Sequence, residues 1–106
     1  MTTFDKREQA FENKFAHDEE LNFKINARRN KLLGLWVADK LGKAGADADA
    51  YAQAVVMSDF EKPGFEDVLH KVMKDITAAG APITREQLCA EAERLLAEAR
   101  TQVMAE

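Results

Sequence analysis

The chain has a single cysteine, two prolines and five glycines among its 106 residues. The one cysteine, Cys89, has no internal disulfide partner, which favours a reducing compartment. So few glycines and prolines argue against an all-β protein, which needs many turns. No apolar run approaches the ~20 residues that cross a bilayer, and the N-terminus lacks the apolar core of a secretory signal. We therefore expect a cytoplasmic protein that is not embedded in a membrane.

An excess of positive charge is also missing, because the formal net charge is −4. Phosphate contacts along a nucleic acid need surplus cations, so we expect no nucleic-acid partner. Neither GxxxxGK[ST] nor GxGxxG, the common glycine-rich phosphate loops, occurs. His17 and His70 are far apart, and neither has a second His or Cys at metal-ligand spacing. We predict no enzyme activity, no metal and no cofactor.

The residues that are present favour helices. The chain is 46% hydrophobic and 32% charged, which is typical of a globular domain, and Leu, Ala, Glu, Lys, Gln and Arg dominate. Helix signals divide it into an N-terminal arm and four helices, expected at about residues 18–41, 48–61 and 65–79 and from Thr84 onward. Short connections make neighbouring helices roughly antiparallel. The predicted fold is all-α, a four-helix bundle.

Several helix ends carry recognisable capping residues. Asp18 is predicted to cap the first helix of the bundle, and Gly80 is predicted to end the third. Thr84 and Gln87 match a capping box, flanked by Ile83 and Leu88 at the spacing of a hydrophobic staple. In the first helix, the expected core-facing residues are Leu21, Ile25, Leu32, Leu35 and Trp36.

The arm carries an aromatic stripe. Phe4, Phe11 and Phe15 are spaced by seven and four residues, so they fall within about 40° of one another on a helix. If the helix continued straight, the expected core-facing residues would be centred about 85° away from this stripe. The stripe would then either fold back on the bundle or face a partner. Charged residues crowd the intervening positions, and so short a segment is marginal as an isolated helix. This favours an arm that is mobile when free and becomes helical in a partner's groove.

A basic run follows the arm, with no acidic residue between Leu21 and Ala38. Its cations are either a solvated helix face or a contact for an acidic protein surface or a nucleotide phosphate. The run consists of Lys24, Arg28, Arg29 and Lys31.

Residues 4–42 read FDKREQAFENKFAHDEELNFKINARRNKLLGLWVADKLG. This segment closely resembles the zeta subunit of alphaproteobacterial F-type ATP synthases, because FAHDEEL, FK, ARRNKLLGLW and LG follow one another in order. Residues 51–69, YAQAVVMSDFEKPGFEDVL, are similar to a second pattern of that family. The remainder matches mainly in its helical layout.

The resemblance implies a bundle at residues 19–106 and a mobile inhibitory arm at residues 1–18. In that family the arm becomes helical in a catalytic interface of the ATPase head and blocks rotation in the hydrolytic direction. The implied partners are the alpha, beta and gamma subunits, which hold the chain peripherally at the inner membrane through the ATP synthase. The expected arm contacts are Phe4, Arg7, Glu8, Phe11, Glu12 and Phe15, with Lys14 finding a partner at the rim.

Two other functions stay open at this point. The first is a nucleotide-binding helical regulatory protein that senses ATP or ADP through the basic run, and weak binding of these nucleotides is also linked to the family's globular domain. The second is an oligomerising bundle whose arm pairs with another copy of the chain.

Overall fold

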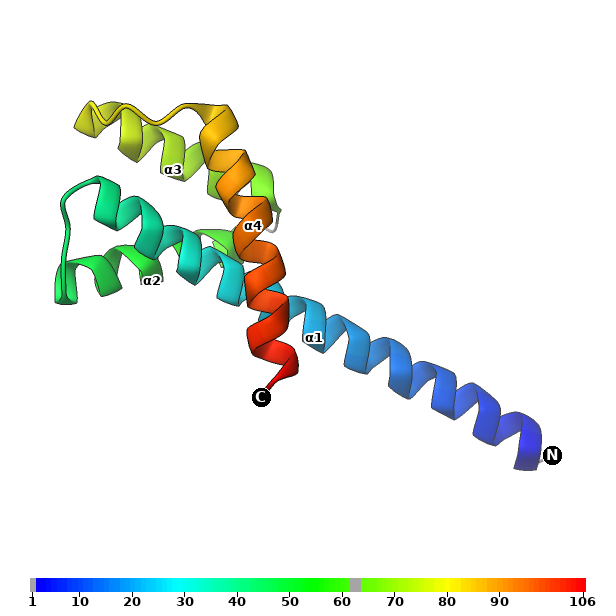
Figure 1. Cartoon of the computed structure of the whole chain (residues 1–106). Helices are drawn as coiled ribbons and strands as arrows, with labels where there is room; N and C mark the ends of the chain where they lie inside the picture. Colours follow the sequence, from blue (N-terminus) through cyan, green and yellow to red (C-terminus); the bar gives the residue numbers. More distant parts are fainter. Residues whose placement is uncertain (1, 62–63) are drawn as a thin grey trace.

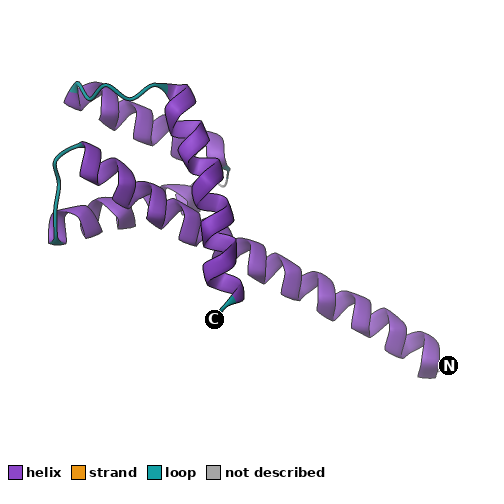
Figure 2. Cartoon of the chain, viewed as in Figure 1, coloured by secondary structure: helices purple, strands orange, loops and turns teal. Residues whose placement is uncertain are grey.

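The computed structural model describes the backbone of residues 2–61 and 64–106 and the side chains of residues 18–59 and 64–106. It contains four helices, α1 (Thr2–Lys40), α2 (Ala46–Glu61), α3 (Phe65–Ala79) and α4 (Arg85–Met104). Short loops join them, and this part of the chain contains no strand (Figure 2). The predicted all-α, four-helix fold is therefore confirmed. None of the helices that are described combines the length and hydropathy needed to cross a bilayer.

The first helix corrects one prediction. α1 is a single helix of 39 residues, and Asp18 lies inside it rather than at the start of a new helix. The physical reason is the absence of a breaker, because residues 2–17 contain neither glycine nor proline. The predicted mobility of the arm, and the placement of its side chains, lie outside the described residues.

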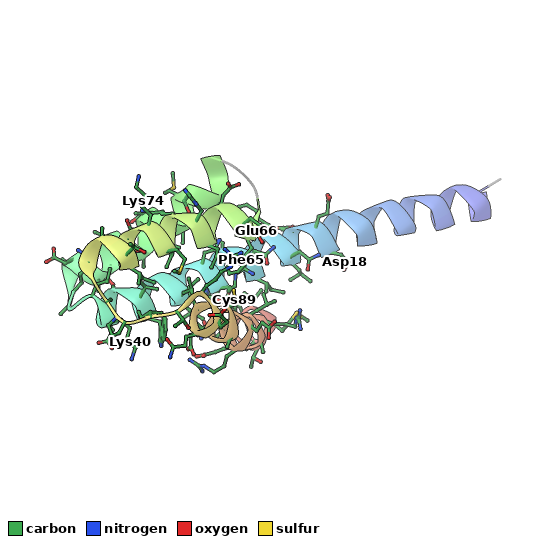
Figure 3. All side chains as sticks on the ribbon, turned by 90° about the horizontal axis from the view of Figure 1, so that it is seen from above. Asp18, Lys40, Phe65, Glu66, Lys74 and Cys89 are labelled. Carbon is green, nitrogen blue, oxygen red and sulfur yellow. The ribbon has the colours of Figure 1, made fainter. Side chains whose placement is uncertain are left out.

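The N-terminal half of α1 projects from the bundle. In Figure 1 it runs well past the C-terminal end of α4, and Figure 3 shows the same projection from above, with Asp18 on the segment that leaves the bundle. The molecule measures 64 × 24 × 22 Å. A helix as long as α1 spans about 58 Å, so this one element sets the length of the molecule.

The C-terminal half of α1 runs through the centre of the bundle and contacts α2, α3 and α4. Ile25 is buried as predicted, and Leu21, Leu32 and Trp36 pack partly buried against the core. Leu35 is only partly buried. Because α1 packs against three helices, its buried side is wider than one seam, and the prediction missed several members of the core. The main cluster contains Leu33, Val37, Val55, Val68, Leu69, Val72, Ile76, Leu88, Ala92 and Leu95.

The ends of α3 and α4 follow the capping signals. Gly80 ends α3 with φ 69°, in the left-handed region that glycine adopts without strain. At the start of α4, the Gln87 backbone N–H donates to Thr84 Oγ1 at 3.1 Å. The Thr84 backbone N–H donates in return to Gln87 Oε1 at 2.9 Å. The predicted capping box is confirmed, and it fixes where α4 begins its crossing of α1.

The backbones of α1 and α2 lie close together at Gly34. A Cβ placed there would lie 2.6 Å from Ala52 Cα, which is backbone and cannot rotate away. We expect Gly34→Ala to destabilise the fold by about 1–3 kcal/mol, as overpacking does, although Ala favours helices over Gly by up to ~1 kcal/mol. Urea unfolding measures the change. Ala54→Gly, at an exposed position of α2, serves as a control for propensity alone. A Gly34→Ala midpoint equal to or above wild type would contradict the close approach.

Candidate interaction site

The site begins where α1 leaves the bundle, which we call the root of the projecting helix (residues 21–32). Ile25 of α1 is buried together with Ala99 and Val103 of α4. The two α4 residues are four positions apart, so they lie on one face of that helix. The final turns of α4 therefore hold α1 just before it leaves the bundle. The partly buried residues around this small cluster are Leu21, Leu32 and Leu96.

A polar contact accompanies the apolar one. Arg28 Nη1 donates to Gln102 Oε1 at 2.9 Å. Its other terminal nitrogen, Nη2, donates to a carboxylate oxygen of Glu106, with which it also forms an ion pair. A guanidinium presents several donors in a planar fork, so one side chain can bind two acceptors at once. Arg28 thus joins α1 to the end of α4.

On the other side of α1, a buried asparagine joins the root to α2 and to the start of α3. Asn30 is fully buried, its Nδ2 donates to Asp59 Oδ2 at 3.3 Å, and its Oδ1 accepts from Arg29 Nε at 3.1 Å. Asp59 Oδ1 accepts from the Gly64 backbone N–H at 3.0 Å. The Arg29 guanidinium also lies 4.5 Å from the centre of the Phe65 ring. Burial lowers the pKa of Arg29, and the nearby Asp59 carboxylate opposes this shift.

The basic run predicted from the sequence does not converge on one point. Arg28 contacts α4, whereas Arg29 contacts Phe65 of α3 and interacts electrostatically with Asp59 of α2. Lys24 pairs with Glu20 on α1 itself at 3.7 Å, and Lys31 is exposed. The structure therefore does not bring these four cations together at one site. Nucleotide binding by this run stays a prediction.

Other chemistry-bearing residues lie away from the root. His70 is exposed, and Cys89 is partly buried against the main cluster, whereas the side chain of His17 lies outside the described residues. Tyr51 donates its hydroxyl to Asp75 Oδ2 at 2.8 Å, and burial is the larger cause of its raised pKa, followed by this hydrogen bond. Within the described part of the chain, no group of three or more His, Cys, Asp or Glu residues is placed to hold a metal ion.

The opposite end of the bundle carries a groove that the sequence did not predict. It has a volume of about 730 Å³ and lies between the C-terminal part of α1 and the start of α4. Trp36 and Ile83 line it, and Lys40 lies 5.5 Å from the Trp36 ring centre at its edge. Because α1 projects from the other end (Figure 1), the groove and the projecting segment are separate surfaces.

The predicted arm residues all belong to the projecting part of α1, where the structure describes a helical backbone. Their side chains lie outside the described residues, so the common face of the three phenylalanines stays a prediction. The partners that hold the root, Asn30, Asp59, Gln102 and Glu106, were missed by sequence reasoning. No local pattern marks them, since each contact joins residues at least 29 positions apart.

These features define a small all-α protein in which one long helix extends from a bundle that holds its root. Comparison with known protein families identifies the family to which this chain belongs. The chain belongs to the family of the ATPase inhibitor subunit zeta, whose model matches residues 1–102. A protein structure solved by solution NMR is 47% identical, with a TM-score of 0.71 over 80% of this chain and 96% of that chain. Among curated proteins, none matches this chain.

Proposed function

We propose that this protein inhibits ATP hydrolysis by an F-type ATP synthase, and that the N-terminal part of α1 does so by inserting into a catalytic interface of the ATPase head. The observation that carries the proposal is the projection of α1 beyond its bundle as one continuous helix. Membership of the ATPase inhibitor subunit zeta family supports the same function. The partners would be the alpha, beta and gamma subunits of the head, which would keep the protein at the membrane periphery.

The chemistry of the arm fits a wedge rather than a catalyst. Phe4, Phe11 and Phe15 recur at helical spacing and would bury between subunits, as aromatic anchors do in helix-in-groove complexes. Arg7, Glu8, Glu12 and Lys14 would pair at the polar rim and fix the register. A catalytic interface that must open and close during turnover stops when a helix fills it.

The width of the bundle limits how far the N-terminal part of α1 can insert. A single helix has a diameter of about 10–12 Å, whereas the molecule is 24 × 22 Å across its two shorter axes. A groove that accepts one helix would therefore exclude the bundle and stop insertion at the root. The bundle would rest on the outer surface of the head, where α4 keeps α1 in place.

We expect the double variant Phe11→Ala/Phe15→Ala to weaken inhibition about 30-fold or more, because truncating two buried aromatic anchors costs at least ~2 kcal/mol. The measurement is the concentration for half-inhibition of ATP hydrolysis by a head depleted of its own zeta subunit. Met57→Ala provides the control, because Met57 is an exposed apolar residue of α2, outside the arm and the root. Its effect should stay within about twofold.

Thermal unfolding of the same double variant shows whether the phenylalanines bind the partner or pack on their own bundle. If the rings bind the partner, the melting temperature should stay close to that of the wild-type chain. A large fall in melting temperature, with inhibition unchanged, would mean that the arm packs on its own bundle and would refute the insertion proposal.

A further inference from the structure

Gln102 in the last turn of α4 and Glu106, two residues past the end of that helix, both bind Arg28 in the root of the projecting helix. Glu98 lies four residues before Gln102 on α4, so these two side chains share one face of that helix. Gln102 Nε2 donates to Glu98 Oε1 at 3.4 Å, which orients the amide, and Gln102 Oε1 then accepts from Arg28 at 2.9 Å. Glu106 accepts from the other arm of the same guanidinium. Arg28 is therefore held at two points, one in the last turn of α4 and one just beyond its end.

The contact of Arg28 with Gln102 and Glu106 lies where the long projecting part of α1 leaves the bundle. About 39 Å of helix separates Arg28 from Thr2, so a change of roughly 5° in the direction of α1 at its root would move the tip by about 3 Å. The apolar cluster of Ile25, Ala99 and Val103 is weakly directional, since hydrophobic contact depends on area rather than angle. Hydrogen bonds weaken steeply when they are misaligned. The two bonds of Arg28 can therefore set an angle that the cluster alone leaves loose.

We infer that Arg28 is a positioning residue, which clamps α1 to the last turn of α4 and to Glu106 just beyond it, and thereby fixes the direction in which the inhibitory helix leaves the bundle. This inference rests on the proposed function. It assigns Arg28 a structural role within the molecule in place of a contact with a nucleotide. An arm held in one direction reaches its groove without first losing orientational freedom, and the fraction of molecules competent to insert is correspondingly high.

The two contacts at the root differ in a way that makes the inference testable. Asn30 is fully buried, so changing it disturbs the fold itself. The Arg28 and Glu106 side chains are 30% and 54% exposed, and exposed ion pairs contribute little to stability. Removing the Arg28 side chain should therefore loosen the direction of α1 while the bundle stays folded.

The experiment uses the full-length chain carrying Arg28→Ala. Spin labels at Glu19→Cys and Lys74→Cys, both exposed positions, report the angle between α1 and the bundle in a Cys89→Ala background. We expect the label distance distribution to widen, the half-inhibitory concentration to rise about fivefold as the competent fraction falls, and the melting temperature to change by less than about 4 °C. Arg85→Ala is the matched control, because Arg85 pairs with Glu66 between α4 and α3 at 3.5 Å, away from the root. It should leave both the distance distribution and inhibition unchanged.

A charge exchange provides the rescue. Arg28→Glu combined with Glu106→Arg restores the ion pair with its polarity reversed, so it should recover a narrow distance distribution and stronger inhibition than Arg28→Glu alone. If Arg28→Ala leaves the distance distribution or the inhibition at the wild-type value, the inference is overturned. The proposed function would survive that result as long as removal of residues 1–15 abolishes inhibition, so the two failures can be told apart.

Discussion

Removal of residues 1–15 is expected to abolish inhibition of ATP hydrolysis while the bundle stays folded. The shortened chain keeps every residue of both hydrophobic clusters, because their first member is Leu21. It loses all three arm phenylalanines and the charged residues between them. If the arm is the wedge, the loss should exceed about 100-fold in half-inhibitory concentration, since several anchor residues disappear together. The assay is steady-state hydrolysis by a head depleted of its zeta subunit.

The matched control for this truncation is a chain of full length with the same arm composition. In it, the phenylalanines at positions 4, 11 and 15 exchange places with polar neighbours, so that they no longer share a helical face. We expect this variant to inhibit almost as poorly as the shortened chain, because the stripe, and not the mere presence of an apolar tail, fits the groove. Undiminished inhibition by the shortened chain would instead assign the activity to the bundle and remove the wedge mechanism.

Features that depend on neighbours in sequence were predicted well. The capping box at Thr84 and the end of α3 at Gly80 were confirmed because each depends on residues within one turn of the helix end. The number and order of the four helices followed from the same signals. The expectation that short connections make neighbouring helices antiparallel does not hold for α4, which runs across α1 and α3 (Figure 3). The start of α1 was wrong, because Asp18 can cap a helix but nothing before it interrupts one.

The prediction that separated the aromatic stripe from the core by direction is wrong as well. It placed the core-facing side about 85° from the stripe, using Leu21, Ile25, Leu32, Leu35 and Trp36. The fully buried Leu33 stands 18 residues after Phe15, which is five full turns, so by periodicity the two share a side of α1. What separates the stripe from the core is distance along the helix, since the N-terminal half of α1 runs past the end of α4 (Figure 1).

The contacts at the root could not be predicted from the sequence. Arg28 and Arg29 are adjacent, which suggested one basic surface, but neighbours on a helix differ by about 100° and here contact different helices. Asn30 lies between Arg29 and Lys31 in the sequence, yet it is fully buried. Whether a polar residue is buried with partners or solvated depends on elements distant in sequence, in this case α2 and the start of α3.

The buried asparagine gives the largest stability effect that we predict. Asn30→Asp preserves size but replaces the amide nitrogen that donates to Asp59 with an oxygen, so two carboxylates would meet at a position with no solvent access. Arg29, already bonded to the other oxygen, offsets only part of this repulsion. We expect a loss of about 3 kcal/mol near pH 7, or more than about 10 °C in melting temperature.

The pH dependence of this loss provides an independent check. Burial and the neighbouring Asp59 raise the pKa of the new carboxyl group in the folded state above its unfolded value of about 4. Both states are protonated at lower pH, so the deficit relative to wild type should be small there and should grow as the pH rises above about 4. Asn26→Asp, the same substitution one turn earlier at an exposed position of α1, should change stability by less than about 0.5 kcal/mol at any pH. Equal and small effects of the two substitutions would mean that Asn30 is solvated, and that α1 is not held to α2 through Asp59.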